Sequence, residues 1–316
     1  MEQITMQEAI RAEALIRQFG IIRAVNEVSF VVEPGEVFGM LGPNGAGKTT
    51  LVRLLNGVIE PDGGTARVLG FDPRTQGEDV RRQTGVLTET PALYERLSAR
   101  DNLLFFGTLY GVPQTDLPRR VDDLLERFGL ADRANDRAGG YSKGMKQRLA
   151  LARTLIHQPR LLFFDEPTAG LDPEAALQVT TLIQELSHRD GRTVFLCTHN
   201  LEEAQRLCDR VAVINQGRLL AVGTAEQLAR GLWQGLWVDV SLLAPSDGLT
   251  ERLRALPGVL DISADGLELA VQVAEEAAIP GLVAGLVAAG APVKRVSPRE
   301  HSLQEIYFKL QEEARS

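Results

Sequence analysis

Gly42-Pro43-Asn44-Gly45-Ala46-Gly47-Lys48-Thr49 is the stretch of this 316-residue sequence that decides its fold. It fits the pattern G-x-x-x-x-G-K-[ST], follows the apolar run Val37–Leu41 and opens a helical pattern over Thr49–Asn56. Glycines in such a loop let successive backbone N–H groups point at phosphate oxygens, and the helix N-terminus adds partial positive charge. A chance glycine turn is the alternative, but the flanking strand and helix favour a P-loop.

The P-loop predicts a nucleotide site that extends from Gly42 to Thr50. Lys48 is expected to reach the β and γ phosphates, and the Thr49 hydroxyl is expected to ligate Mg²⁺. The nucleotide is expected to be ATP, which the chain would hydrolyse.

A second apolar run begins at Leu161 and ends in two carboxylates, Asp165 and Glu166. Asp165 is expected to hold Mg²⁺ through water, and Glu166 to orient or deprotonate the water that attacks the γ-phosphate. Acids at a strand end are usually only a solvated terminus, but the upstream P-loop favours a catalytic role. His199 closes a third run, Thr193–Thr198, and is expected to contact phosphate, with a structural histidine as the alternative.

The chain changes pattern twice along its length. Over residues 1–230, short apolar runs closed by polar residues or glycine alternate with helical patterns, which predicts an α/β P-loop domain with buried parallel strands. Residues from about Thr90 to Gly140 are mostly helical in pattern, so we expect a helical insertion, with the helical subdomain at about residues 90–160.

Residues 231–316 predict a small second domain. Strand and helix signals follow in the order β-α-β-β-α-β, at Leu236–Leu243, Leu249–Leu256, Val259–Ser263, Leu267–Val273, Ala274–Ala289 and Pro292–Val296. This is the order of a split βαβ, ferredoxin-like α+β unit. An amphipathic helix from Ser302 to about Glu313 is expected to end the chain.

Composition limits the classes of protein to which the chain can belong. Hydrophobic residues make up 44% and the net charge is −8, which argues against a general nucleic-acid binder. The charged segment Met1–Gln18 and the lack of a run of 18 apolar residues predict a cytoplasmic protein that does not itself span a membrane. Cys197 and Cys208 are expected to be free thiols, with a disulfide or metal site as the alternative.

Two further motifs change the interpretation of the P-loop. Tyr141-Ser-Lys-Gly-Met145 lies upstream of Asp165, and Gly170-Leu-Asp172 lies downstream of it. With the P-loop, the two carboxylates and His199, these motifs resemble those of the ATPase subunits of ABC transporters. The resemblance covers roughly residues 5 to 230 in unbroken order.

The resemblance implies a composite site shared by two chains. Tyr141–Met145 stands where the family carries its LSGGQ signature, which binds the ATP held by the P-loop of the other subunit. A head-to-tail homodimer is therefore expected, in which Ser142 and the backbone of Gly144 touch the γ-phosphate in trans. The rest of the signature, Met145 included, is expected to lie beside that γ-phosphate. Asp172 is expected to lie across the dimer interface from it.

Three positions depart from the family pattern. The signature reads Y-S-K-G-M, so that Lys143 either adds a positive charge near the γ-phosphate or points to solvent. Glu89 stands where the family has the Q-loop glutamine, and it is expected to ligate Mg²⁺ or its water while adding negative charge. Phe19 matches the aromatic residue that stacks on adenine; a core phenylalanine is the alternative.

Local details resemble one subfamily. The segments YSKGMKQRL and TETPALYERL, and the ending Ser302-Leu-Gln-Glu-Ile-Tyr-Phe, look like those of ABC-2 type exporter ATPases. The resemblance implies a separate membrane-spanning permease that docks near Leu93–Tyr110. This permease would hold the protein at the inner face of the membrane. No nucleic acid is expected as a partner. A soluble non-transport ATPase and an importer ATPase are the rival readings. Residues 231–316 are expected to stabilise the dimer, with ligand sensing as the alternative.

Overall fold

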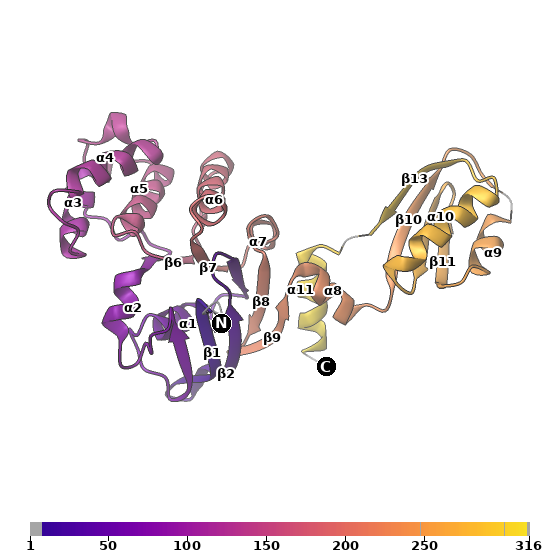
Figure 1. Ribbon diagram of the computed structural model, residues 1–316, viewed down its shortest axis with the longest axis horizontal. Helices are drawn as coiled ribbons and strands as arrows, with labels where there is room; N and C mark the ends of the chain where they lie inside the picture. Colours follow the sequence, from indigo (N-terminus) through magenta and orange to yellow (C-terminus); the bar gives the residue numbers. More distant parts are fainter. Residues whose placement is uncertain (1–7, 247, 300, 315–316) are drawn as a thin grey trace, which may run out of the picture. The chain divides into compact units, whose positions relative to one another are not determined.

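The computed structural model describes residues 8–246, 248–299 and 301–314. The chain divides into two compact units, Met1–Thr224 and Ala225–Ser316, which Figure 1 shows with their elements labelled. The sequence pattern predicts the boundary after residue 230. The structure places it after Thr224 because helix α8 (Ala225–Leu232) packs against the C-terminal helix α11 (Leu303–Glu313) within the second unit.

The first unit is built on a six-stranded sheet of order β5-β6-β7-β3-β8-β9. All neighbouring strands are parallel except β8 and β9, which are antiparallel. The strands are β3 (Val37–Leu41), β5 (Thr84–Leu87), β6 (Leu161–Asp165), β7 (Thr193–Thr198), β8 (Arg210–Asn215) and β9 (Arg218–Gly223). Every residue of β3, β6 and β7 is buried, which explains their unbroken apolar sequences. Helices α1 (Lys48–Leu55), α2 (Gly77–Gln83), α6 (Pro173–His188) and α7 (Leu201–Leu207) connect the strands.

A three-stranded antiparallel sheet, which the sequence patterns did not predict, lies beside this core. Its order is β2-β1-β4, with strands β1 (Ile10–Phe19), β2 (Ile22–Val32) and β4 (Gly63–Val68). Phe30 of β2 stacks on Phe38 of β3 with ring centroids 5.5 Å apart, so the two sheets share one apolar core.

The helical subdomain expected at about residues 90–160 contains α3 (Ala99–Leu109), α4 (Leu117–Arg127) and α5 (Lys143–Leu155), with 3₁₀ turns η1 (Ala131–Arg133) and η2 (Ala138–Gly140) between the last two. Figure 1 shows the three α-helices gathered together in magenta. Leu103, Val121 and Leu149 are among the apolar residues that join them. Helix α5 begins at Lys143 because Ser142 caps its N-terminus.

The second unit contains a four-stranded antiparallel sheet of order β11-β12-β10-β13 with its own apolar core. The element order β-α-β-β-α-β is the expected one, and it places β10 and β12 in the middle of the sheet. The elements are β10 (Leu236–Leu242), α9 (Leu249–Arg254), β11 (Val259–Asp265), β12 (Glu268–Val273), the 3₁₀ turn η3 (Glu276–Ala278), α10 (Ile279–Ala288) and β13 (Val293–Pro298).

Outside this sheet, the same unit pairs α8 with α11. Directly after α8, the indole of Trp233 stacks on the imidazole of His301 with ring centroids 3.9 Å apart and planes 5° from parallel. Ser302 and Glu305 form a capping box that starts α11. None of the helices in the described ranges is long and apolar enough to cross a membrane.

Candidate nucleotide-binding site

The P-loop joins β3 to α1 at the carboxyl edge of the parallel sheet. Gly47 is the N-cap of α1 and has φ +111°, a backbone conformation that L side chains rarely adopt. A Cβ at Gly47 or at Gly42 would lie closer than 3.0 Å to the carbonyl oxygen of Ala24 or Ile214, respectively. Only glycine therefore lets this loop wrap tightly over the start of α1, whose first N–H groups have no partner within the helix.

The other P-loop residues differ in their exposure. Pro43, Asn44 and Gly45 are exposed at the tip of the loop, and Ala46 is buried beneath it. The N–H of Gly217 donates to the carbonyl of Ala46 over 3.0 Å, which fixes the loop to the turn between β8 and β9. Thr49 is exposed and Thr50 is half-buried in the first turn of α1.

Lys48 carries a buried ammonium group, with 6% of the residue exposed. Its Nζ donates to the carbonyl of Gly42 over 2.6 Å and lies 3.5 Å from Oε1 of Glu166. The Lys48 ammonium group thus lies between the P-loop and the end of β6, where it faces both the loop and the expected catalytic base.

Thr49 and Asp165 are brought into direct contact. The Thr49 hydroxyl donates to Oδ2 of Asp165 over 2.7 Å, although 116 positions separate the two residues. Burial raises the pKa of Asp165 above its ordinary value, and the negative charges of Glu166 and Glu89 raise it further, while Thr49 and Lys48 lower it. The excess of negative charge around Asp165 is what a divalent cation would neutralise, and a hydroxyl and a carboxylate are oxygen ligands that suit Mg²⁺.

Glu89 lies exposed just after β5, next to the carboxyl end of β6, and its charge acts on Asp165. Among the described residues, no group of three or more His, Cys, Asp or Glu side chains is arranged to hold a metal ion. A cation at Asp165 would therefore need water and phosphate oxygens in addition to nearby protein oxygens, as Mg²⁺ commonly does in nucleotide sites.

Glu166 and His199 form a hydrogen-bonded pair. Nδ1 of His199 lies 2.8 Å from Oε1 of Glu166, which is 8% exposed, whereas the imidazole is more than half exposed. Glu166 has φ +50°, unusual for a residue with a side chain, and its N–H donates to the carbonyl of Cys197 over 2.9 Å. The turn after β6 thus aims the carboxylate back towards Lys48 and the end of β7.

The signature residues start helix α5. The Ser142 side chain accepts the N–H of Met145 over 3.2 Å as N-cap, and a Cβ at Gly144 would lie 2.8 Å from that of Ala175 in α6. Nζ of Lys143 lies directly over Gly170, so that this side chain packs on the following loop.

Hydrogen bonds fix the start of α6 and tie α5 to the turn after Glu166. Asp172 caps α6 by accepting the N–H of Ala175 over 2.9 Å. Nε2 of Gln147 in α5 donates to the carbonyl of Pro167 over 2.6 Å, directly after Glu166. Sequence patterns did not single out Gln147, whose polarity within a buried stretch of α5 is the signal that could have done so.

Phe19 ends β1 and is 45% exposed, with the guanidinium of Arg17 lying 4.8 Å from its ring centroid. The alternative of a core phenylalanine is therefore wrong. Cys197 and Cys208 are free thiols, and burial raises the pKa of both.

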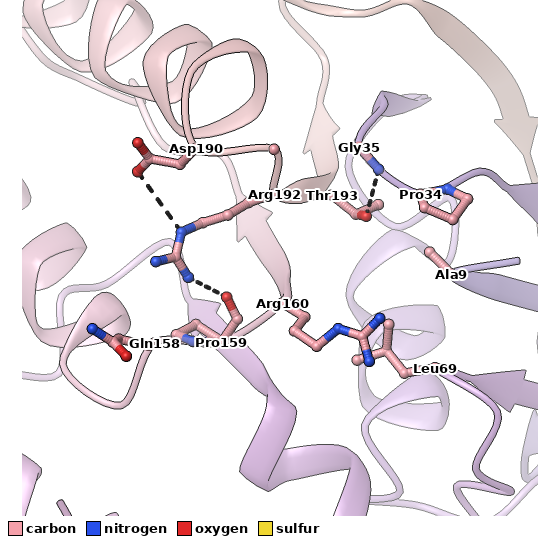
Figure 2. Close-up of a pocket in the computed structure, with 11 residues that line it drawn as sticks. Ala9, Pro34, Gly35, Leu69, Gln158, Pro159, Arg160, Asp190, Arg192 and Thr193 are labelled. Atoms are coloured by element: carbon pink, nitrogen blue, oxygen red, sulfur yellow. Dashed lines mark hydrogen bonds and ion pairs between the residues drawn. The ribbon is translucent and has the colours of Figure 1, made fainter. Parts of the chain in front are cut away.

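A cavity of about 240 Å³ lies elsewhere in the first unit. Pro34, Pro159 and Thr193, which line it, stand at the amino ends of β3, β6 and β7, the opposite edge of the sheet from Lys48. Figure 2 shows Arg192 there, between the carboxylate of Asp190 and the carbonyl of Pro159. This cavity is distinct from the site formed by the P-loop, Asp165 and Glu166.

Known proteins share both the sequence and the fold. The family pattern described as ABC transporter matches residues 25–169. The chain is 44% identical over 210 residues to the ABC transporter ATP-binding protein NatA of Bacillus subtilis (strain 168), covering 66% of this chain and 85% of that protein. It is 39% identical over 304 residues to the daunorubicin resistance ATP-binding protein DrrA3 of Streptomyces coeruleorubidus, covering 96% and 95%. A solved structure described as the ATP binding subunit of an ABC transporter has 32% identity and a TM-score of 0.65, over 71% of this chain and 92% of that one.

Proposed function

The chain belongs to the ABC transporter family of ATP-binding proteins, an ATPase family, and from this we propose that it energises export through a separate membrane permease of the ABC-2 type. One observation carries the catalytic part of the proposal. At the carboxyl edge of the sheet, Thr49 contacts Asp165 over 2.7 Å, and Glu166 contacts His199 over 2.8 Å and Lys48 over 3.5 Å. The two sets adjoin because Lys48 precedes Thr49 and Asp165 precedes Glu166 in the chain. The group that these residues form combines a cation for phosphate, oxygen ligands for a metal ion and a carboxylate for water.

We assign ATP and Mg²⁺ to this group. Backbone N–H groups from Gly42 to Thr50 would hold the phosphates, with Lys48 at the β and γ phosphates. Thr49, Asp165 and Glu89 would hold Mg²⁺, which supplies charge neutralisation between the β and γ phosphates when bound. The negative potential around Asp165 supports this assignment.

Glu166 would orient and deprotonate the attacking water. Phosphoryl transfer depends mainly on positioning and on charge stabilisation, so the fixed direction of this carboxylate is its contribution. His199 binds Glu166 through Nδ1, which leaves its other ring nitrogen free to contact the γ-phosphate. The partly exposed Phe19 would stack on adenine.

Two copies would complete each site. Each chain holds one P-loop and one signature, so a head-to-tail homodimer would bury two ATP molecules between them. Ser142, Lys143, Gly144 and Met145 would face the γ-phosphate of the other copy, with Asp172 across the interface. The bond from Gln147 to Pro167 would join the signature of one site to the base of the other.

The permease would dock on the helical subdomain and hold the protein at the inner face of the membrane. Tyr94 and Phe105, both about half exposed, meet edge to face with centroids 4.9 Å apart on this subdomain. Exposed aromatic rings of this kind are common at protein interfaces. The match to DrrA3, named for drug resistance, extends over 304 residues and so favours export over import. We assign the first unit, residues 1–224, to ATP hydrolysis and the second unit, residues 225–316, to dimer stabilisation.

Glu166→Gln tests the catalytic assignment because it keeps the shape and removes the base. We expect this variant to bind ATP, to accumulate as an ATP-bound dimer in size-exclusion chromatography and to lose turnover. Glu78→Gln in α2, which removes an exposed carboxylate, is the matched control and should hydrolyse ATP normally. Hydrolysis by Glu166→Gln at the native rate would refute the base assignment.

The export part is tested by the neighbouring reading frame and by co-purification. A neighbouring multi-helix membrane protein that co-purifies with this chain, and is lost with Phe105→Asp, would support the exporter assignment. A neighbouring periplasmic binding protein would favour an importer instead.

A further inference from the structure

Behind Glu166 lies a second buried carboxyl group that the hydrolysis scheme does not use. Glu203 in α7 is 5% exposed, and both of its side-chain partners are neutral hydroxyls. Thr168 Oγ1 lies 2.8 Å from Oε1, and Thr198 Oγ1 lies 2.8 Å from Oε2. Buried carboxyl groups are rare without a cation or a coordinated set of donors, so this arrangement requires an explanation.

The Thr198 hydroxyl lies between the two carboxyl groups. Its Oγ1 is 2.8 Å from Oε2 of Glu203 and 3.3 Å from Oε2 of Glu166, and it also accepts the N–H of Asn200 over 3.0 Å. A hydroxyl has one hydrogen, so it cannot donate fully to two carboxylates at once. Burial raises the pKa of Glu203, which favours a proton on that group. A protonated Glu203 donates to Thr198, and the Thr198 hydrogen is then free for Glu166.

Glu203 also holds the turn that carries Glu166. Thr168 stands two residues after Glu166, whose φ of +50° is strained for a residue with a side chain. Strain of this kind persists only where the surroundings hold the backbone in place. Through Thr168 and Thr198, one carboxyl group binds both the turn after β6 and the end of β7, the two segments that meet at the expected base.

We propose that Glu203 and Thr198 are positioning residues that orient the carboxylate of Glu166 for attack by water. Oε2 of Glu166 is held by Thr198, while Oε1 faces His199 and Lys48. The inference rests on the proposed role of Glu166 as base and adds the group that aims it. The hydrogen bonds that the side chains of Thr198 and Glu203 make among the described residues go to neither end of the P-loop, so we expect nucleotide affinity to change little when this pair is altered.

The test compares isosteric variants. Thr198→Val keeps the volume and removes the hydroxyl, and we expect kcat to fall about tenfold, the usual effect of losing one hydrogen bond to a charged group, while KM stays unchanged. Thr198→Ser should recover most of the loss. Glu203→Gln, which can still donate to Thr198 and accept from Thr168, should stay near the native rate, whereas Glu203→Met should lose activity.

Thr180→Val is the matched control, because its hydroxyl is buried in α6 and donates only to the carbonyl of Ala176. Thr198→Val is also combined with Glu166→Gln, where it should cause no further loss if it acts through that carboxylate. Native kcat in Thr198→Val, or no rescue by Thr198→Ser, would overturn the proposal. Native turnover in Glu166→Gln alone would instead overturn the base assignment, so the two failures are distinguishable.

Discussion

Replacing Gly47 by alanine should destabilise the first unit much more than the same change at Gly45. Both glycines have positive φ, +111° and +80°, so both substitutions incur the backbone cost of about 1–2 kcal/mol for an L-residue in that region. A Cβ at Gly45 meets nothing within 4 Å, whereas one at Gly47 comes inside 3.0 Å of the Ala24 carbonyl oxygen. That contact is with strand β2 backbone, which cannot rotate away.

Overpacking of this kind costs about 1–3 kcal/mol, which brings the expected loss for Gly47→Ala to about 2–5 kcal/mol. Urea unfolding followed by far-ultraviolet circular dichroism gives both values from the midpoint and slope. Gly45→Ala serves as the control that carries the backbone cost alone. Equal shifts for the two variants would show that the approach of Ala24 does not restrict Gly47.

Three further outcomes are expected. Lys48→Ala should weaken ATP binding at least about a hundredfold, because a charge-assisted contact with phosphate is lost. Titration with a fluorescent ATP analogue measures this, and Arg53→Ala, which removes an exposed cation, is the control that should bind normally. Tight binding by Lys48→Ala would contradict the P-loop assignment. Phe19→Ala should weaken ATP binding about tenfold and Phe19→Tyr should not, as expected for base stacking; equal affinities would argue against the adenine contact. Folding raises the pKa of Asp165 above its unfolded value near 3.8. The protonated Asp165 side chain therefore stabilises the folded state below pH 3.8, and this stabilisation is lost as the pH rises through the folded-state pKa. Asp165→Asn should therefore raise the melting temperature at neutral pH without ATP or Mg²⁺ and flatten its pH profile, and an unchanged profile would count against buried charge at this position.

Three of the buried parallel strands were predictable to the residue, whereas β5 was not predicted. The apolar runs predict strands at Val37–Leu41, Leu161–Asp165 and Thr193–Thr198, and the structure has strands with these bounds. Strands covered on both faces carry no polar alternation, so the apolar run extends over the whole strand. Strand β1 gives no such signal, because bulges interrupt its pairing with β2 and its outward residues are polar.

Helix starts were harder to predict. The pattern over Ala274–Ala289 predicts one helix, but a 3₁₀ turn comes first and α10 begins only at Ile279, with Pro280 in its first turn. Helix α5 begins with the signature residues themselves, and its N-terminus is set by the Ser142 cap. In both cases the terminus is set by capping and backbone geometry, which apolar periodicity does not report.

Some residues of the candidate site could be predicted from the sequence and others could not. Motif spacing was enough to predict Lys48, Thr49, Asp165, Glu166 and His199, which the structure brings together. The contacts of Thr198 and Glu203 with Glu166 and Thr168 depend on the way in which β6 and β7 lie side by side. A local signal for Glu203 did exist, since Asn200-Leu-Glu-Glu203 has the spacing of an N-terminal capping motif. Such spacing identifies a helix start and does not reveal a link to a base 37 positions away.

The stacked Trp233 has an optical consequence. The chain has two tryptophans, Trp233 and Trp237, and both belong to the second unit. Intrinsic tryptophan emission therefore reports the loss of the pairing with His301 and of strand β10, and carries no signal from residues 1–224. On one urea series, emission would follow the second unit alone and circular dichroism the whole chain, so a circular dichroism transition without a matching change in emission would belong to the nucleotide-binding unit.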